Sequence, residues 1–183
     1  MKIVQERLQM NKILNIFLTL FITLFFASCS TKYDYDLKTV QNVDLNKYIG
    51  SWYEIARFEH YFQKDCKNVK AHYTLRDDGK IDVLNSCTKI STNKYKQATA
   101  IAYSVNSSNS KLKVSFFRPF YADYWILDLD EDYKYAIIGT PSKEYLWIIS
   151  REKTMDDKLL NSLLEKIENL GFDTSKLIFT IQE

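Results

Sequence analysis

The sequence predicts an all-β domain of eight antiparallel strands, followed by one α-helix. From Trp52 onward, short runs rich in Tyr, Val, Ile and Phe recur at regular spacing. No two of these runs are separated by a dozen residues that could form a crossover helix, which favours antiparallel pairing. The one long helical pattern comes after the eighth run. Eight such strands favour either a sandwich or an up-and-down barrel, and the pattern alone leaves both open.

The second and third strands are the clearest of the eight. Residues 69–75 read VKAHYTL, which is apolar at every second position, and residues 81–85 read IDVLN. The Asp-Gly pair at 78–79 lies between these runs and is a strong hairpin signal. The resulting register pairs residue 75 with 81, 73 with 83 and 71 with 85. The other strands are predicted at residues 51–59, 97–105, 111–117, 124–129, 133–139 and 145–150.

The helix is predicted from a single apolar stripe of Leu and Ile over residues 159–170. Thr154 is the expected N-cap, and the aspartates that follow it favour the positive end of the helix dipole. Gly171 stands where a C′ glycine ends a helix. A last strand is predicted over residues 177–181 and a short helical turn over residues 44–48.

The charge balance argues against nucleic acid as a partner. The chain has 183 residues, with 25 Lys+Arg and 23 Asp+Glu, and without its first 28 residues the two numbers are equal. Neutralising phosphates requires a basic excess, which is absent here. The sequence also has no polybasic segment of the kind that holds a peripheral protein on a membrane. Aromatic residues make up 15% of the chain, against only 4 Gly and 2 Pro, which argues for a compact domain.

Residues 1–28 are predicted to be a lipoprotein signal peptide. Residues 13–26 form an apolar run of 14 residues, which is shorter than the roughly 20 that a membrane span needs. Basic residues precede this run, as in a secretory signal. Ala27-Ser28 followed by Cys29 resembles a bacterial lipobox, at which a diacylglyceryl group carrying palmitate-type chains is attached to the Cys before cleavage. An uncleaved N-terminal anchor helix and a start at Met10 are the alternatives.

The prediction for the rest of the chain follows from this cleavage. Residues 29–42 are expected to be a lipidated tether, and residues 43–183 the folded domain. Two or three acyl chains on Cys29 would hold the protein permanently on a membrane. Because Ser30 rather than Asp follows Cys29, retention at an inner membrane is not signalled. The expected location is the bacterial outer membrane, on its periplasmic face.

Two further cysteines, Cys66 and Cys87, are expected to form a disulfide because the chain is predicted to be exported. The strand register brings Cys87 near Val69, so the bridge requires a bend at the start of the second strand. Two free buried thiols are the alternative. The histidines, His60 and His72, have no partners at metal-ligand spacing, so no metal is predicted.

Three short motifs resemble the signatures of the lipocalin family. Gly50 and Trp52 open the first predicted strand as Gly-x-Trp. Asp132 and Tyr133 lead into the seventh strand, and Arg151 follows the eighth. Longer stretches, such as GSWYEIARFEHYF and GFDTSK, are similar to bacterial lipoproteins of that family.

The resemblance implies an eight-stranded antiparallel up-and-down β-barrel, with the C-terminal α-helix packed outside. It also implies that Trp52 closes one end of the barrel. The Arg151 guanidinium is then expected to pack over the Trp52 ring as a cation–π contact. Arg151 is also expected to bond the backbone carbonyls of the turn that precedes the first strand.

Alternation along the strands predicts which side chains face into such a barrel. The predicted lining residues are Tyr73, Val83, Asn85, Val114, Phe116, Tyr124, Ile137, Tyr145 and Trp147. Tyrosine hydroxyls and an amide in an apolar chamber would orient the head group of an amphiphile. The alternative is that the same aromatic residues fill a solid core. Residues 58–62 are expected at the mouth of the barrel, as a lipid gate or a packed lid.

The resemblance implies a binding protein for an amphiphilic lipid, either a fatty acid or a lysophospholipid, that serves lipid storage or transport and envelope maintenance. No cofactor is expected and no catalytic residue is assigned, since phosphate-loop, nucleophile-elbow and dinucleotide motifs are absent. An enzyme acting on a lipid or isoprenoid in the same cup, and a partner-binding structural protein with a filled barrel, are alternatives. Haem is a weaker ligand alternative, and association into a homodimer is left open.

Overall fold

The computed structural model describes residues 33, 34 and 36–183. The predicted signal peptide and the predicted lipidation site, Cys29, lie outside these residues. The strands are β1 Gly50–Phe58, β2 Cys66–Leu75, β3 Ile81–Lys89, β4 Tyr95–Ser104, β5 Lys111–Phe117, β6 Phe120–Leu129, β7 Tyr135–Gly139, β8 Leu146–Ser150 and β9 Leu177–Phe179. The helices are α2 Leu45–Tyr48 and α3 Asp157–Asn169, with 3₁₀ turns η1 Tyr61–Gln63 and η2 Thr174–Lys176.

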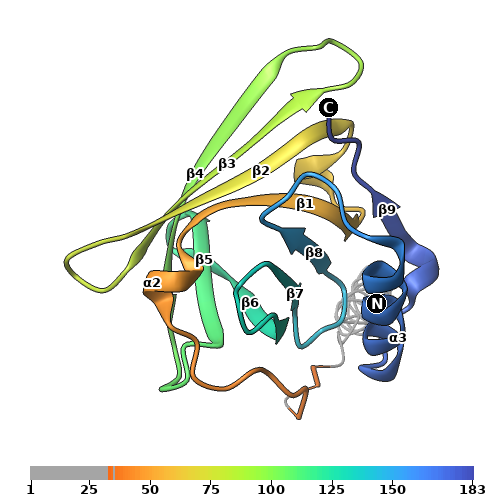
Figure 1. Cartoon of the computed structure of the whole chain (residues 1–183). Coiled ribbons are helices and arrows are strands. Elements are labelled where there is room, and N and C mark those ends of the chain that lie inside the picture. The colour runs from red at the N-terminus through yellow and green to blue at the C-terminus, as the bar shows by residue number, and fades with distance from the viewer. Residues whose placement is uncertain (1–32, 35) are drawn as a thin grey trace, which may run out of the picture. The chain divides into compact units, whose positions relative to one another are not determined.

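The strands form one antiparallel up-and-down barrel, as the family resemblance predicted. Each strand from β2 to β8 pairs with its neighbour in sequence, and β1 pairs with both β8 and β2 (Figure 1). This double pairing of β1 closes the sheet, which decides between the barrel and the sandwich. The predicted hairpin register is confirmed, with Leu75 opposite Ile81 and Tyr73 opposite Val83.

The C-terminal strand β9 fills the space in the barrel wall where β1 and β2 separate. Beyond Tyr53, β2 leaves β1, and β9 pairs with β1 in its place. The Gln182 side chain then bridges the two separated strands, because its amide donates to the carbonyls of Glu54 at 2.8 Å and Val69 at 2.9 Å. The predicted last strand over residues 177–181 is therefore shorter than expected, and the following residues join the wall through side chains.

The hydrophobic core has two parts, one on each side of the barrel wall. The inner part fills the closed end of the barrel and includes Trp52, Ile126 and Ile138. The outer part lies between the wall and α3, where Leu163 and Ile167 are fully buried. All residues of both parts belong to the compact unit 33–183, so this unit carries its own core and is expected to fold by itself.

The helix α3 begins two residues later than predicted. Its N-cap is Asp156 rather than Thr154, because the Asp156 carboxylate accepts hydrogen bonds from the backbone N–H groups of Lys158 and Leu159. The predicted end of the helix is correct: Gly171 follows it with a φ of +81°, a conformation that glycine adopts without strain.

Part of the segment predicted as a tether packs on the barrel. Leu37 is buried in the outer core, and the backbone N–H of Val40 donates to the carbonyl of Ile126 in β6. This polar stretch contains too few apolar residues to show a helical or strand periodicity, so its packing was not predicted. No helix in the described part of the chain is both long and apolar enough to cross a membrane.

Candidate functional site

One end of the barrel is closed by Trp52 beneath Arg151, in the arrangement that the resemblance implied. Trp52 is fully buried, and its indole N–H donates to the carbonyl of Tyr48 at 2.8 Å. The Arg151 guanidinium lies 3.7 Å from the centre of the indole ring. Arg151 also donates to the backbone carbonyls of Ser51, Lys47, Tyr48 and Tyr133 at 2.8–3.2 Å.

The remaining closure residues, Gly50, Asp132 and Tyr133, contribute in different ways. Gly50 has a φ of +93°, and an added Cβ there would lie 3.4 Å from an Arg151 nitrogen. The Tyr133 hydroxyl accepts from the backbone N–H of Asp44 at 2.9 Å. Asp132 is exposed and only pairs with a neighbouring lysine. Asp130 organises this turn instead, because its carboxylate accepts from two backbone N–H groups.

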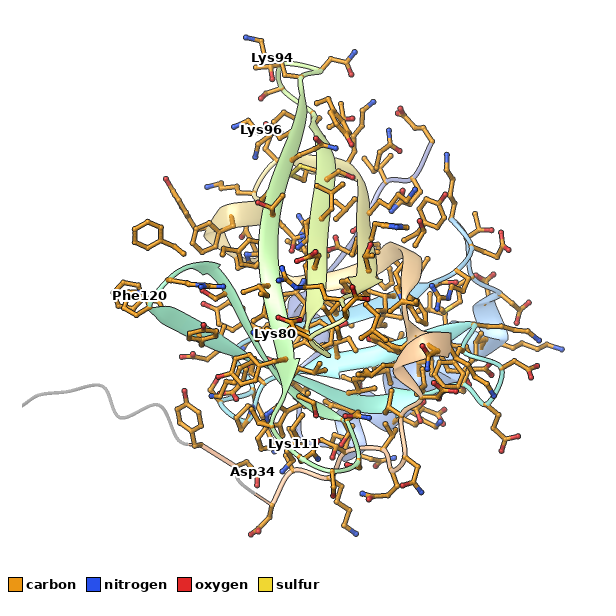
Figure 2. All side chains as sticks on the ribbon, turned by 90° about the vertical axis from the view of Figure 1, so that its left-hand side faces the viewer. Asp34, Lys80, Lys94, Lys96, Lys111 and Phe120 are labelled. Carbon is orange, nitrogen blue, oxygen red and sulfur yellow. A yellow bond between two sulfur atoms is a disulfide. The ribbon has the colours of Figure 1, made fainter. Side chains whose placement is uncertain are left out.

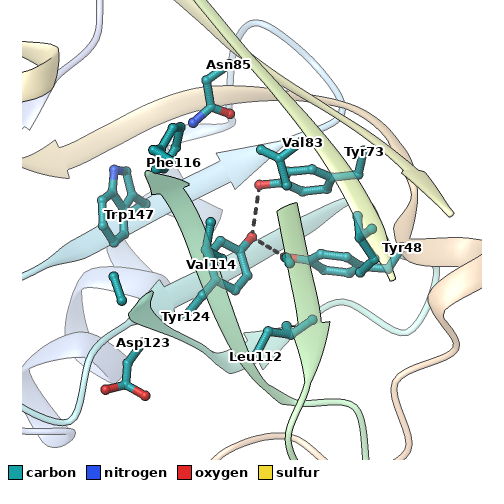
Figure 3. Close-up of a pocket in the computed structure, with 13 residues that line it drawn as sticks. Tyr48, Tyr73, Val83, Asn85, Leu112, Val114, Phe116, Asp123, Tyr124 and Trp147 are labelled. Atoms are coloured by element: carbon teal, nitrogen blue, oxygen red, sulfur yellow. Dashed lines mark hydrogen bonds between the residues drawn. The ribbon is translucent and has the colours of Figure 1, made fainter. Parts of the chain in front are cut away.

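A deep chamber of about 130 Å³ lies above the closed end. Its apolar wall surrounds three tyrosines, whose hydroxyls are joined through Tyr124 at 2.7 Å to Tyr48 and 3.1 Å to Tyr73 (Figure 3). Burial raises the pKa of all three and places that of Tyr73 at about 12. The hydroxyls therefore stay protonated at neutral pH and satisfy one another. Tyr48 was not among the predicted lining residues, since it belongs to the short turn α2 and no strand alternation points to it.

Seven of the nine predicted lining residues surround this chamber. They are Tyr73, Val83, Asn85, Val114, Phe116, Tyr124 and Trp147. The prediction for Ile137 was wrong, because Ile137 packs in the outer core beneath α3 and its neighbour Ile138 faces inward. Strand β7 is apolar on both faces, so alternation gave no signal. Tyr145 lies just before β8, at the rim, and lines neither this chamber nor the wider one above it.

A wider cavity of about 720 Å³ forms the mouth of the barrel. It shares Asn85, Phe116 and Trp147 with the deep chamber, so these three residues lie where the two spaces meet. The mouth is lined by η1 and by β3 and β4, and it includes Lys64, Lys89 and Lys96. The site is thus apolar at its bottom, and its opening adds three lysines to a wall that is still mainly apolar.

Asn85 carries an unused acceptor at the junction of the two cavities. Its side-chain oxygen is buried and accepts no hydrogen bond from the described residues. A buried amide oxygen without a partner is unfavourable in an empty site. A ligand hydroxyl or amine at this point would supply the missing donor.

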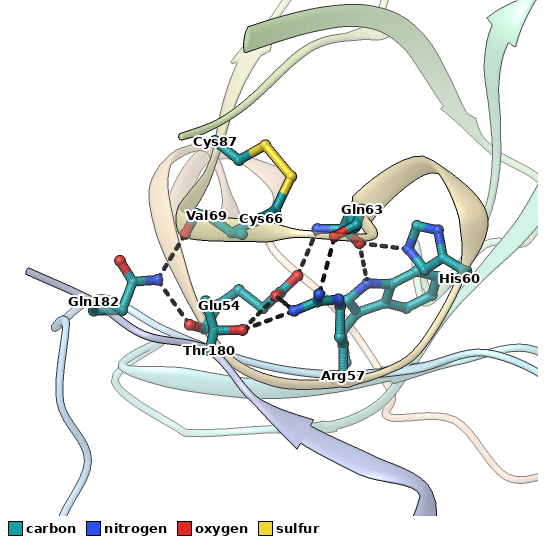
Figure 4. A network of polar contacts seen from close by, with 10 residues as sticks. Glu54, Arg57, His60, Gln63, Cys66, Val69, Cys87, Thr180 and Gln182 are labelled. Atoms are coloured by element: carbon teal, nitrogen blue, oxygen red, sulfur yellow. Dashed lines mark hydrogen bonds and ion pairs between the residues drawn. A yellow bond between two sulfur atoms is a disulfide. The ribbon is translucent and has the colours of Figure 1, made fainter. Parts of the chain in front are cut away.

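Side-chain hydrogen bonds of Gln63 hold the 3₁₀ turn η1 beside the mouth. The Gln63 side-chain oxygen accepts from the Trp147 indole at 3.0 Å and from His60 at 2.5 Å (Figure 4). Its amide donates at 2.7 Å to Glu54, which forms a buried ion pair of 2.8 Å with Arg57. Burial lowers the pKa of His60, which keeps the imidazole neutral at neutral pH.

The buried ion pair was not predicted from the sequence. Glu54 and Arg57 face inward on either side of a bulge in β1, where simple alternation fails. Thr180 of the C-terminal tail completes the pair, since its hydroxyl donates to Glu54 at 2.5 Å. No local sequence signal connects residues so distant in the chain.

The predicted disulfide between Cys66 and Cys87 is confirmed, with the two Cα atoms 5.7 Å apart. Strand β2 bends at its start, as the bridge required: the register shifts between Lys67 and Lys70, and Asn68 has a φ of +53°. Cys87 lines the mouth, but as half of a disulfide it is no nucleophile. Within the described residues, no cluster of three or more His, Cys, Asp or Glu could hold a metal ion.

Comparison with known proteins agrees with this architecture. The Lipocalin-like domain family matches residues 43–182. "Outer membrane lipoprotein Blc" of Vibrio cholerae is 42% identical over 80% of this chain and 87% of that protein, and the Escherichia coli K12 protein of the same name is 40% identical over 78% and 81%. Insecticyanin of Manduca sexta shares the fold, with a TM-score of 0.67 at 22% identity over 82% of this chain and 87% of that one. Barrel, closure and sequence together show that the chain belongs to the lipocalin family.

Proposed function

We propose that the barrel binds one amphiphilic lipid, a fatty acid or a lysophospholipid, and that it does so without catalysing a reaction. The observation that carries this proposal is the pairing of an apolar deep chamber with a wider basic mouth. Apolar burial would drive binding, at roughly 25 cal/mol per Å² before the entropy of ordering is subtracted.

The shape of the site supports one orientation of the ligand. The deep chamber, at about 130 Å³, accommodates the end of an acyl chain against the tyrosine hydroxyls. The mouth is several times larger and takes the rest of the chain together with the head group. Lys64, Lys89 and Lys96 would attract a carboxylate or phosphate there, and Asn85 would accept from a hydroxyl.

The cellular role follows from the lipobox-like sequence and from the names of the relatives. Two of them are called outer membrane lipoproteins, which supports an envelope location for this chain. We propose that Cys29 is acylated and holds the barrel on the periplasmic face of the outer membrane. The bound lipid would then be stored or transported within the envelope.

Native mass spectrometry of residues 30–183, produced in a bacterial host, tests the binding proposal. An acyl species should accompany the folded protein, should be lost on organic extraction, and should be replaced by added lysophospholipid. A bare protein that takes up neither palmitate nor lysophospholipid at micromolar concentration contradicts the proposal. The same spectra report whether two barrels associate into a homodimer.

The alternative functions predict different results. A partner-binding structural protein would have a filled barrel and would exclude fluorescent fatty acids. An enzyme acting on a lipid or isoprenoid would change the mass of an added ligand over time. Because Cys66 and Cys87 form a disulfide, neither has a free thiol, which weighs against a thiol-dependent reaction inside the barrel.

A further inference from the structure

The open end of the barrel carries most of the exposed aromatic side chains of the described chain. Tyr61 and Phe62 in η1 are 86% and 87% exposed. Phe117 and Phe120, on either side of the β5–β6 turn, are 75% and 70% exposed. Tyr95, Phe116, Tyr121 and Tyr145 at the same end are also exposed. Away from this end, the exposed Phe, Tyr and Trp side chains of the described residues are Tyr33 and Phe179. Large apolar side chains gathered on one face of a domain mark an interaction surface.

Basic side chains lie on the same turns of the open end as these rings or on the neighbouring β3–β4 hairpin. They are Lys64, Lys89, Lys94, Lys96 and Arg118, against the acids Glu59 and Asp65 on the same segments. Within the described residues none of the five cations forms an ion pair, and Asp65 is held by the backbone N–H and hydroxyl of Ser91. Figure 2 shows Lys94 and Lys96 on the β3–β4 hairpin, which projects beyond the barrel, and Phe120 pointing outward from its own turn. The cations come from separate parts of the sequence, so no polybasic run was visible in it.

We propose that this rim, formed by residues 59–65, 89–96 and 117–121, docks on an anionic phospholipid bilayer. Aromatic rings favour the interface between head groups and acyl chains. Basic side chains beside them gain attraction from the negative surface of such a bilayer. Rings and cations together bind more firmly than either does alone.

Charge complementarity favours the bilayer over a second copy of the chain. Two rims facing each other would bring two sets of like charges together, which is unfavourable. A bilayer containing anionic lipid supplies the opposite charge to every cation at once. The inference goes beyond ligand binding, because a barrel that holds no lipid inside would still dock through this rim.

Vesicle flotation of residues 30–183 tests the proposal, since this part carries its own core and lacks Cys29. The protein should float with phosphatidylcholine vesicles that contain 30% phosphatidylglycerol, float less with phosphatidylcholine alone, and be released by 0.5 M salt. The double variants Phe117→Ser/Phe120→Ser and Lys94→Glu/Arg118→Glu should each bind the anionic vesicles at least about tenfold more weakly. None of these four residues lines either cavity, so uptake of a fatty acid should be unchanged.

Matched controls carry the same changes away from the rim. Lys47→Glu/Lys158→Glu alters charge equally on α2 and α3, and Val105→Ser/Phe179→Ser removes two exposed apolar side chains. Both controls should float like the unmodified protein. In addition, the fluorescence of Phe120→Trp should be quenched by brominated acyl chains, and that of Val105→Trp should not.

Three results would overturn the proposal. The first is no flotation with anionic vesicles. The second is equal weakening in rim and control variants, which would indicate non-specific charge attraction. The third is a concentration-dependent dimer in sedimentation that Phe117→Ser/Phe120→Ser abolishes while vesicle binding persists, which would assign the rim to a second copy.

Discussion

The two ends of the barrel use their polar groups in opposite ways. At the closed end, all three guanidinium nitrogens of Arg151 and the indole N–H of Trp52 have backbone acceptors. At the open end, the Asn85 oxygen is buried without a donor, and several aromatic rings project into solvent. The closed end is therefore internally satisfied, whereas the open end retains unused binding capacity. The difference indicates that stability and binding can be changed separately in this protein.

The largest expected effect comes from breaking the closed end. Trp52→Ala should lower the free energy of unfolding by about 3–5 kcal/mol, because a fully buried aromatic ring is replaced by a cavity. Urea unfolding followed by circular dichroism measures this change. Fatty-acid affinity of the fraction that stays folded should be preserved, since Trp52 lines neither cavity.

The matched variant at the open end is Trp147→Ala. Trp147 is only partly buried, so the loss of stability should be smaller, while fatty-acid affinity should fall because Trp147 lines both cavities. Equal losses of stability in the two variants would contradict the separation of the two ends.

The next largest effect is a fall in the free energy of unfolding at high pH, caused by the buried tyrosines at the bottom of the deep chamber. The pKa of Tyr73 is raised by burial from 10.0 to about 12, so the unfolded chain releases this proton first. The resulting stabilisation is complete below pH 10 and is lost as the pH rises towards 12, by about 2–3 kcal/mol. Urea unfolding at intervals from pH 9 to 12 should show this decline.

Tyr73→Phe is the control for the titration. The variant lacks the hydroxyl, so the difference between its unfolding free energy and that of the unmodified protein should narrow across the same range. A constant difference from pH 9 to 12 would mean that Tyr73 does not titrate in this way.

The inward side chains of a strand could be predicted from the sequence only where its two faces differ in polarity. On β2 and β3 one face is polar, so alternation predicted the register and the inward position of Tyr73. On β7 the helix covers the outer face, both faces are apolar, and Ile137 was assigned to the wrong side. The inward charges Glu54 and Arg57 depend on a bulge and on the distant tail, which leave no local pattern.

A smaller loss of stability is expected when the hydrogen bonds that hold η1 are removed. Gln63→Ala removes the bonds to Trp147 and His60 and one of the partners of the Glu54 carboxylate, which should lower the free energy of unfolding by about 1–2 kcal/mol. The exchange of a fluorescent fatty acid should also become faster, because η1 borders the mouth. Gln41→Ala, at an exposed residue outside both cavities whose amide donates only to the backbone carbonyl of Thr39, should change neither quantity.

The smallest expected effect is a gain in the free energy of unfolding, at the polar group where the deep chamber meets the mouth. Asn85→Leu removes a buried acceptor that has no partner, so the empty protein should become more stable by about 1 kcal/mol. Under the proposed function the same change should weaken binding of a lysophospholipid, whose free hydroxyl can donate to Asn85, by roughly tenfold. Binding of palmitate, which has no hydroxyl donor when ionised, should be affected less. Equal loss for both ligands would mean that Asn85 shapes the cavity and accepts no bond from the lipid, and loss of stability would mean that its oxygen is already satisfied in the empty protein.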